Sequence, residues 1–249
     1  MTQMKRNNFL PRPDRRLFLI AGSSMALAAC GSLDKLVGPP DAPQIYALRP
    51  ALSPAQTSGG KVSWALAIQK PSAAGNLDSA RIALARNGMQ LDYYAKAAWP
   101  DRLPDLVQTA LLAGFEATGR IDAVSRDEDA LQSDYQLSTE LRDFEARYAT
   151  PDGAPNVAVT IIAHMADTKS RKILANFSVN LTEPASANSV DAVVQALNTA
   201  LAKAVDQITQ WALALPPPTT TNSTEADLPP PPKPTRTPRL PDIDSPRAP

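Results

Sequence analysis

Few residues in this 249-residue chain are able to do chemistry, and the first of them is its only cysteine, Cys30. A deprotonated thiol is a strong nucleophile and can accept a lipid group. A lone cysteine cannot form an internal disulfide, so a disulfide-stapled fold is excluded. One cysteine and one histidine are also too few for a soft-ligand metal site, and the sequence predicts none.

The residues before Cys30 have the order of an export signal, which we place at residues 1–29. A basic start is followed by an apolar stretch at residues 17–22 and then by small residues. The apolar stretch is too short to span a bilayer, which needs about 20 apolar residues. The end of the export signal resembles the lipobox of bacterial lipoproteins, with the residues Leu27, Ala28, Ala29, Cys30 and Gly31. This resemblance implies cleavage before Cys30 and a covalent lipid on its thiol.

Two further features of this region bear on export and sorting. Arg15 and Arg16 resemble a twin-arginine signal, although Asp14 stands where Ser or Thr is usual. An ordinary basic start is the alternative. Gly31 and Ser32 differ from the Asp that retains lipoproteins at the inner membrane, which implies the periplasmic face of the outer membrane. Two or three acyl chains would hold the protein there, at ~0.8 kcal/mol per buried methylene.

No other residue pattern predicts catalysis. The only histidine, His164, is either a general base or a partly exposed strand residue near a turn. No nucleophile elbow, phosphate-binding loop or dinucleotide-binding turn is present. The acidic residues 127–129 lack the spacing of a calcium-binding loop. We therefore expect a protein that is not an enzyme and that needs no cofactor beyond the lipid on Cys30.

Aromatic side chains gather at Tyr93, Tyr94 and Trp99, between a predicted hairpin and a predicted helix. They form either a contact site for a partner or a core corner that joins sheet and helix.

Composition divides the mature chain into three parts. Residues 30–43 are a short lipidated linker, residues 44–215 an ordered domain, and residues 216–249 a proline-rich tail. The tail has too little apolar surface to offset its ordering entropy, so we expect disorder with polyproline II character. The full chain has zero net charge and no basic stripe, which argues against nucleic acid as a partner.

Periodicity predicts the elements of the domain. Alternation predicts a half-buried strand at residues 61–69 and a hairpin at residues 81–94, turning at Asn87 and Gly88. Helical spacing predicts a helix at residues 103–115, with Asp101 as its cap and Gly119 at its exit.

The second half of the domain follows the same logic. Strands are predicted at residues 121–124, 135–142, 157–165 and 173–181, and a long helix begins at Ser189 and stops at Pro216. The fold class is therefore α+β, an antiparallel-rich sheet with two helices packed on one face.

Several segments together resemble the ABC-type transport auxiliary lipoproteins, which accompany MCE-domain lipid transporters. The resemblance spans about residues 46–213. It rests on short segments in a shared order: Tyr46–Ala47–Leu48, Leu77–Asp78 before Arg81–Ile82, Leu91–Asp92–Tyr93–Tyr94, Ala98–Trp99 and residues 103–115. Pro100 departs from the Ala that often follows the Trp, and the tail lies outside the shared pattern.

The resemblance implies a component without catalysis that docks a phospholipid transporter to the outer membrane. Its implied partners are an MCE-domain protein, ABC transporter subunits and the membrane, and a second copy of the chain is a further candidate. The alternative is a structural lipoprotein of another envelope assembly, for secretion, lipopolysaccharide transport or peptidoglycan tethering. A periplasmic hydrolase would have only His164 to use.

Overall fold

A computed structural model describes residues 42–52, 60–129 and 131–217. Cys30, its lipobox and sorting residues, Arg15 and Arg16, and the tail from residue 218 onward lie outside the described residues. In the described ranges no helix has the length and apolar character needed to cross a membrane.

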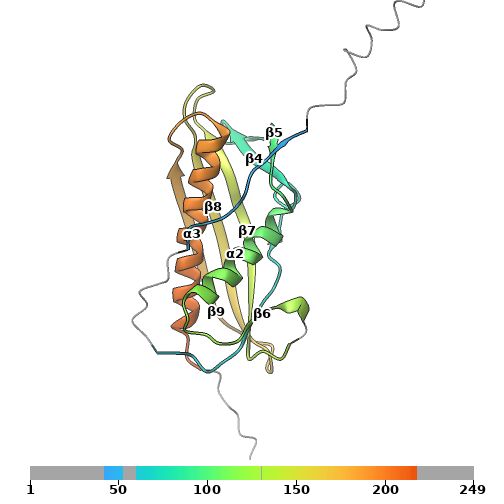
Figure 1. Ribbon diagram of the computed structural model, residues 1–249, viewed down its shortest axis with the longest axis vertical. Helices are drawn as coiled ribbons and strands as arrows, with labels where there is room; N and C mark the ends of the chain where they lie inside the picture. Colours follow the sequence, from blue (N-terminus) through green and yellow to red (C-terminus); the bar gives the residue numbers. More distant parts are fainter. Residues whose placement is uncertain (1–41, 53–59, 130, 218–249) are drawn as a thin grey trace, which may run out of the picture.

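The described chain forms one mixed sheet and two helices (Figure 1). The elements in chain order are β1 Gln44–Ile45, β2 Leu66–Ile68, β3 Ser72–Ala73, β4 Arg81–Arg86, β5 Gln90–Ala98, α2 Leu103–Ala117, β6 Val124–Arg126, the short 3₁₀ helix η2 Asp127–Asp129, β7 Tyr135–Tyr148, β8 Asn156–Asp167, β9 Ile173–Pro184 and α3 Val190–Leu213.

The long strand β7 organises the sheet. Along one side β7 pairs antiparallel with β8, which pairs antiparallel with β9. Along its other side β7 is shared by β2, β3 and β4, each short and each parallel to it. The sheet then continues through β2 to β6, and through β4 to β5 and β1. The longest pairings are thus antiparallel, within a sheet that is mixed as a whole.

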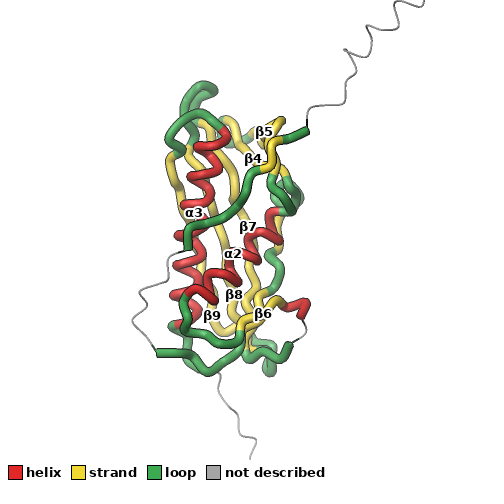
Figure 2. Tube along the Cα trace, viewed as in Figure 1, coloured by secondary structure: helices red, strands yellow, loops and turns green. Residues whose placement is uncertain are grey.

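Both helices cover the same face of the sheet, as predicted (Figure 2). Helix α3 packs on β8 and β9, and α2 packs on α3, β6 and β2. The helices come close enough that Gly114 of α2 lies directly against Val205 of α3. Ser189 caps α3, its hydroxyl accepting a bond from the Ala192 amide at 3.3 Å.

The β4–β5 hairpin also forms as predicted. Asn87 has φ 52° and Gly88 has φ 69°, the two positive values that a type I′ turn needs. The Met89 amide closes the turn on the Arg86 carbonyl at 3.3 Å. Strand β5 then runs to Ala98, four residues past the predicted hairpin, with a register shift against β4.

Two local predictions were wrong. The cap of α2 is Arg102 rather than Asp101, and it makes no side-chain cap bond. The Ser79 carbonyl instead accepts the first helical amide, that of Leu103, while Arg102 pairs with Asp78. The Asp101 carboxylate accepts the amide of the next residue, Arg102, at 2.7 Å, which is not a cap bond to the first turn of the helix.

Regular strand structure in residues 61–69 is limited to β2, whose three residues are all buried. The predicted half-buried strand is interrupted before Leu66, because the Asp134 carboxylate accepts the Ala65 amide at 3.0 Å. Val62 keeps one isolated bridge to Ile121. The strand predicted at residues 121–124 is found later in the chain, as β6, which begins at Val124.

Candidate functional site

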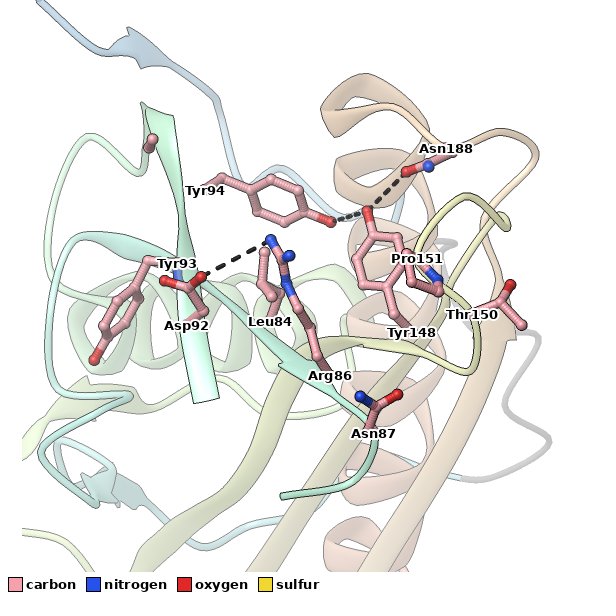
Figure 3. Close-up of a pocket in the computed structure, with 11 residues that line it drawn as sticks. Leu84, Arg86, Asn87, Asp92, Tyr93, Tyr94, Tyr148, Thr150, Pro151 and Asn188 are labelled. Carbon is pink, nitrogen blue, oxygen red and sulfur yellow. Dashed lines mark hydrogen bonds and ion pairs between the residues drawn. The ribbon is translucent and has the colours of Figure 1, made fainter. Parts of the chain in front are cut away.

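A cleft of about 380 Å³ opens where β4, β5 and the end of β7 approach the residues before α3 (Figure 3). Alternation along β4 and β5 places Leu84, Asp92 and Tyr94 on one side of this hairpin. Residues from three other places complete the cleft: Tyr148 at the end of β7, Thr150 and Pro151 in the next turn, and Asn188 before the α3 cap.

A chain of hydrogen bonds crosses this cleft. The Tyr148 hydroxyl donates to the Asn188 side-chain oxygen at 3.0 Å and lies 2.9 Å from the Tyr94 hydroxyl. Because a hydroxyl has one proton to donate, Tyr94 is the donor to Tyr148. Burial, followed by this hydrogen bond, raises the pKa of Tyr94 far above its ordinary value. Tyr94 is therefore neutral at physiological pH.

One ion pair lies beside the tyrosines. Arg86 and Asp92 approach to 3.8 Å, with about half of each side chain exposed. This spacing is loose, so the guanidinium keeps donors that are free to meet a ligand. The cleft thus offers aromatic surface, hydrogen-bond donors and one carboxylate, an arrangement that suits binding.

Tyr93 stands on the opposite side of β5 from Tyr94, although both lie along the cleft rim. The Arg81 guanidinium stacks on its ring at 3.6 Å from the centroid, and its hydroxyl donates to the Asn76 carbonyl at 3.2 Å. These contacts fix the orientation of Tyr93.

Trp99 does not join the two tyrosines. Its side chain is 2% exposed and packs edge-to-face on Phe144, with ring centroids 6.3 Å apart. The core-corner interpretation of Trp99 therefore fits the structure, and direct contact of Trp99 with a partner does not.

His164 lies on the sheet face opposite the helices. Its Nδ1 is 2.6 Å from the Asn176 side-chain oxygen on β9. Among the described residues no group of His, Cys, Asp and Glu side chains is arranged to hold a metal ion. The hydrogen-bond partner that the described residues give His164 is this amide, and the residues opposite it in register are Ser138 of β7 and Asn176 of β9.

A second exposed feature is the outer edge of β9. This strand has 12 residues and, within the described ranges, pairs only with β8. The β8–β9 turn beside it carries Lys169, and the large apolar side chains of Ile173 and Leu174 at the start of β9 are 61% and 52% exposed. An edge strand of this length, paired along one side, is able to accept an added strand along its other side.

The sequence predicted Tyr93 and Tyr94 but not the partners of Tyr94 in the cleft. Tyr148 lies 54 residues after Tyr94 in the sequence, and Asn188 lies 40 residues after Tyr148. Tyr148 is the last residue of β7 and lies beyond the end of the predicted strand. For Asn188, the one clue in the sequence was its position directly before the helix cap Ser189.

Comparisons with known proteins agree with the fold. Residues 46–209 match the model of the ABC-type transport auxiliary lipoprotein component family. A crystal structure of a Xanthomonas campestris protein of the DUF330 family has a TM-score of 0.64 and 29% identity, covering 68% of this chain and 94% of that one. Another uncharacterized protein has a TM-score of 0.54 at 16% identity, covering 69% of this chain and 99% of its own, a likeness of fold alone.

An uncharacterized protein of Bradyrhizobium diazoefficiens is 33% identical over 150 residues. That match covers 60% of this chain and 40% of the relative, so the shared region is less than half of the relative's length. The family match covers most of the described domain and lies within residues 44–215. The chain therefore belongs to the ABC-type transport auxiliary lipoprotein component family.

Proposed function

We propose that this protein is the lipid-anchored, non-catalytic component that docks an MCE/ABC-type phospholipid transport system to the periplasmic face of the outer membrane. The observation that carries the proposal is the family match over residues 46–209. The proposed partners are an MCE-domain protein and the ABC transporter subunits with which it works.

The physical need for such a component follows from the cost of moving lipid through water. Each exposed methylene costs ~0.8 kcal/mol, so a transporter requires a sheltered path between the membranes. A component fixed in one membrane holds the end of that path in place.

The anchor that we propose is a lipid on Cys30. Ala42, the first described residue, lies twelve positions after Cys30, and the chain between them reaches about 40 Å when it is fully extended. This linker is comparable in length to α3, so the domain would stay close to the membrane and remain free to reorient towards a partner.

Two surfaces of the described domain suit protein docking. The cleft beside Tyr94 offers aromatic area and hydrogen-bond donors. The outer edge of β9 offers backbone groups for strand addition, without a charged residue between Ile173 and Thr182 to oppose it.

The test begins with the anchor. Cells given radiolabelled palmitate should label the native chain and not the Cys30→Ala variant, and only the native chain should sediment with outer membranes. The native chain should also retain an MCE-domain protein on affinity purification.

Two results would contradict the proposal. Label in the Cys30→Ala variant would exclude Cys30 as the acylated residue. Loss of the gene with no change in outer-membrane permeability or detergent sensitivity would exclude the transport role. Crosslinking to peptidoglycan in place of an MCE protein would favour a structural envelope lipoprotein.

A further inference from the structure

We propose that the cleft beside Tyr94 binds a small zwitterion in which a phosphate and an ammonium group are joined by two carbons. Arg86 holds the phosphate and Asp92 holds the ammonium. A phosphoethanolamine unit has this chemistry, either as the headgroup of a lipid or as a free soluble molecule. The inference goes beyond the proposed docking role and does not depend on it, because it concerns a ligand of the cleft and is tested with soluble compounds.

The two charged side chains of the cleft form a long, open ion pair. Nη2 of Arg86 lies 3.8 Å from Oδ2 of Asp92, and the side chains are 54% and 48% exposed. A charge-assisted hydrogen bond would bring such atoms to about 2.7–2.9 Å. The other carboxylate oxygen, Oδ1, accepts the Tyr93 amide at 2.8 Å, which holds the carboxylate in place. Both charges are therefore fixed at the cleft wall and accessible to a ligand (Figure 3).

The balance of these charges selects the kind of ligand. A simple anion that paired with Arg86 would lie next to the Asp92 carboxylate and would take away its partner, and a simple cation would do the same to Arg86. A zwitterion instead replaces one long ion pair by two short ones. In phosphoethanolamine the two charges lie roughly 4–5 Å apart, given single bonds of about 1.5 Å. This separation is similar to that of the two protein groups.

The rest of the cleft lining suits the same two groups. A phosphate has several acceptor oxygens, and the planar guanidinium of Arg86 matches their geometry. Asn87 and Thr150 also line the cleft and carry further donors. An ammonium group is attracted to aromatic faces, which Tyr94 and Tyr148 supply. The hydrogen bond between their hydroxyls holds both rings in place before a ligand arrives, which reduces the entropy lost on binding.

The size of the cleft limits the ligand to a small molecule. Its volume of about 380 Å³ lies near the lower end of the range of ligand-binding sites, about 300–1,000 Å³. Leu84, which is 2% exposed, closes it from beneath. The volume suits a molecule of headgroup size rather than one that includes acyl chains.

Isothermal titration calorimetry on the purified, full-length protein in a nonionic detergent tests this selectivity. The probes are O-phosphoethanolamine, glycerophosphoethanolamine, ethyl phosphate, which lacks the ammonium, and ethanolamine, which lacks the phosphate. A hydrogen bond to a charged group changes affinity by about tenfold or more. We therefore expect at least one zwitterion to bind about tenfold more tightly than either single-charge probe. Tighter binding of the glycerol diester identifies a lipid headgroup as the source, and tighter binding of the monoester identifies a free phosphoamine.

Two variants assign the roles of the charged residues. Asp92→Asn keeps an acceptor for the Tyr93 amide but removes the negative charge, so it should weaken zwitterion binding about tenfold without weakening ethyl phosphate binding. Arg86→Gln should weaken the binding of every phosphate probe. The matched control is Glu140→Gln, because Glu140 and Arg142 form a similarly exposed ion pair outside the cleft, and it should leave all affinities unchanged.

The proposal is overturned if the zwitterions bind the native protein no more tightly than ethyl phosphate does, a result that needs no variant to fold. It is also overturned if Asp92→Asn, shown by circular dichroism to be folded, weakens ethyl phosphate and zwitterion binding equally, or if Glu140→Gln has the effect expected of Asp92→Asn.

Discussion

The contact between α2 and α3 predicts that Gly114→Ala lowers the stability of the native protein but raises the stability of a Val205→Ala variant. A Cβ added at Gly114 would lie 2.2 Å from Cγ1 of Val205, far inside van der Waals contact. Val205 is fully buried, and a β-branched side chain on a helix has one strongly preferred χ1 rotamer. It cannot rotate away, so in Gly114→Ala the two helices must move apart.

Two opposing effects set the size of the change. Alanine is favoured over glycine in a helix by about 1 kcal/mol. Overpacking a well-packed core costs about 1–3 kcal/mol, and a contact this short belongs at the upper end. We therefore expect Gly114→Ala to lower the free energy of unfolding by about 1–2 kcal/mol.

The same substitution should stabilise a Val205→Ala background. Once Cγ1 is removed, the nearest atoms to the new methyl are Thr209 Oγ1 at 3.5 Å and the Cβ of residue 205 at 3.7 Å, which are ordinary contacts. The added methyl then partly fills the cavity and keeps its helix preference, a gain of about 1 kcal/mol. The coupling between the two sites should be about 2–3 kcal/mol.

Denaturant unfolding of the four chains in this cycle measures the coupling, with equal m-values as the check that unfolding is two-state. Gly75→Ala serves as the control, because a Cβ there meets no atom within 4 Å. If Gly114→Ala changes stability equally with valine and with alanine at position 205, the steric argument is refuted.

Three further predictions concern other parts of the domain. Ser189→Ala should lower the unfolding free energy by about 1 kcal/mol in denaturant titrations through loss of the α3 cap, and the exposed control Ser186→Ala should not. The raised pKa of Tyr94 favours its neutral form in the folded state, so this contribution to stability is intact below pH 10 and is lost as pH rises above it. Above pH 10 the melting temperature of Tyr94→Phe should accordingly fall less steeply with pH than that of the native protein. An equal fall in both proteins would contradict this reasoning. Ser178→Lys with Thr182→Lys should reduce co-purification of the MCE-domain protein without changing the melting temperature, and undiminished recovery would exclude the β9 edge as the docking surface.

Elements defined by neighbouring residues were predicted well from the sequence. The β4–β5 turn depends on Asn87 and Gly88, both of which adopt positive φ. Helix α3 depends on a 3.6-residue period and a serine cap, and both are present. Strands β8 and β9 keep one register from Asn156 to Met165, so most of their side chains stay in phase with the core, and the register shifts between Met165 and Ala166, where β9 begins.

Strand β7 shows where local pattern fails. Its odd-numbered residues are buried up to Leu141, and after a bulge the even-numbered Phe144 and Ala146 are buried instead. A bulge inserts one residue and reverses which side chains face the core. The predicted strand therefore ended at Arg142, although β7 continues for six residues more, to Tyr148.

The cleft depends on that continuation. By itself, the sequence determined two helices, the hairpin, the longest strand pairs and the aromatic pair Tyr93 and Tyr94. Tertiary structure decided that Trp99 is buried and that Tyr148 and Asn188 meet Tyr94. The physical reason is that periodicity records which face of an element is buried, whereas contacts between residues 40 to 54 positions apart depend on strand order, register and bulges.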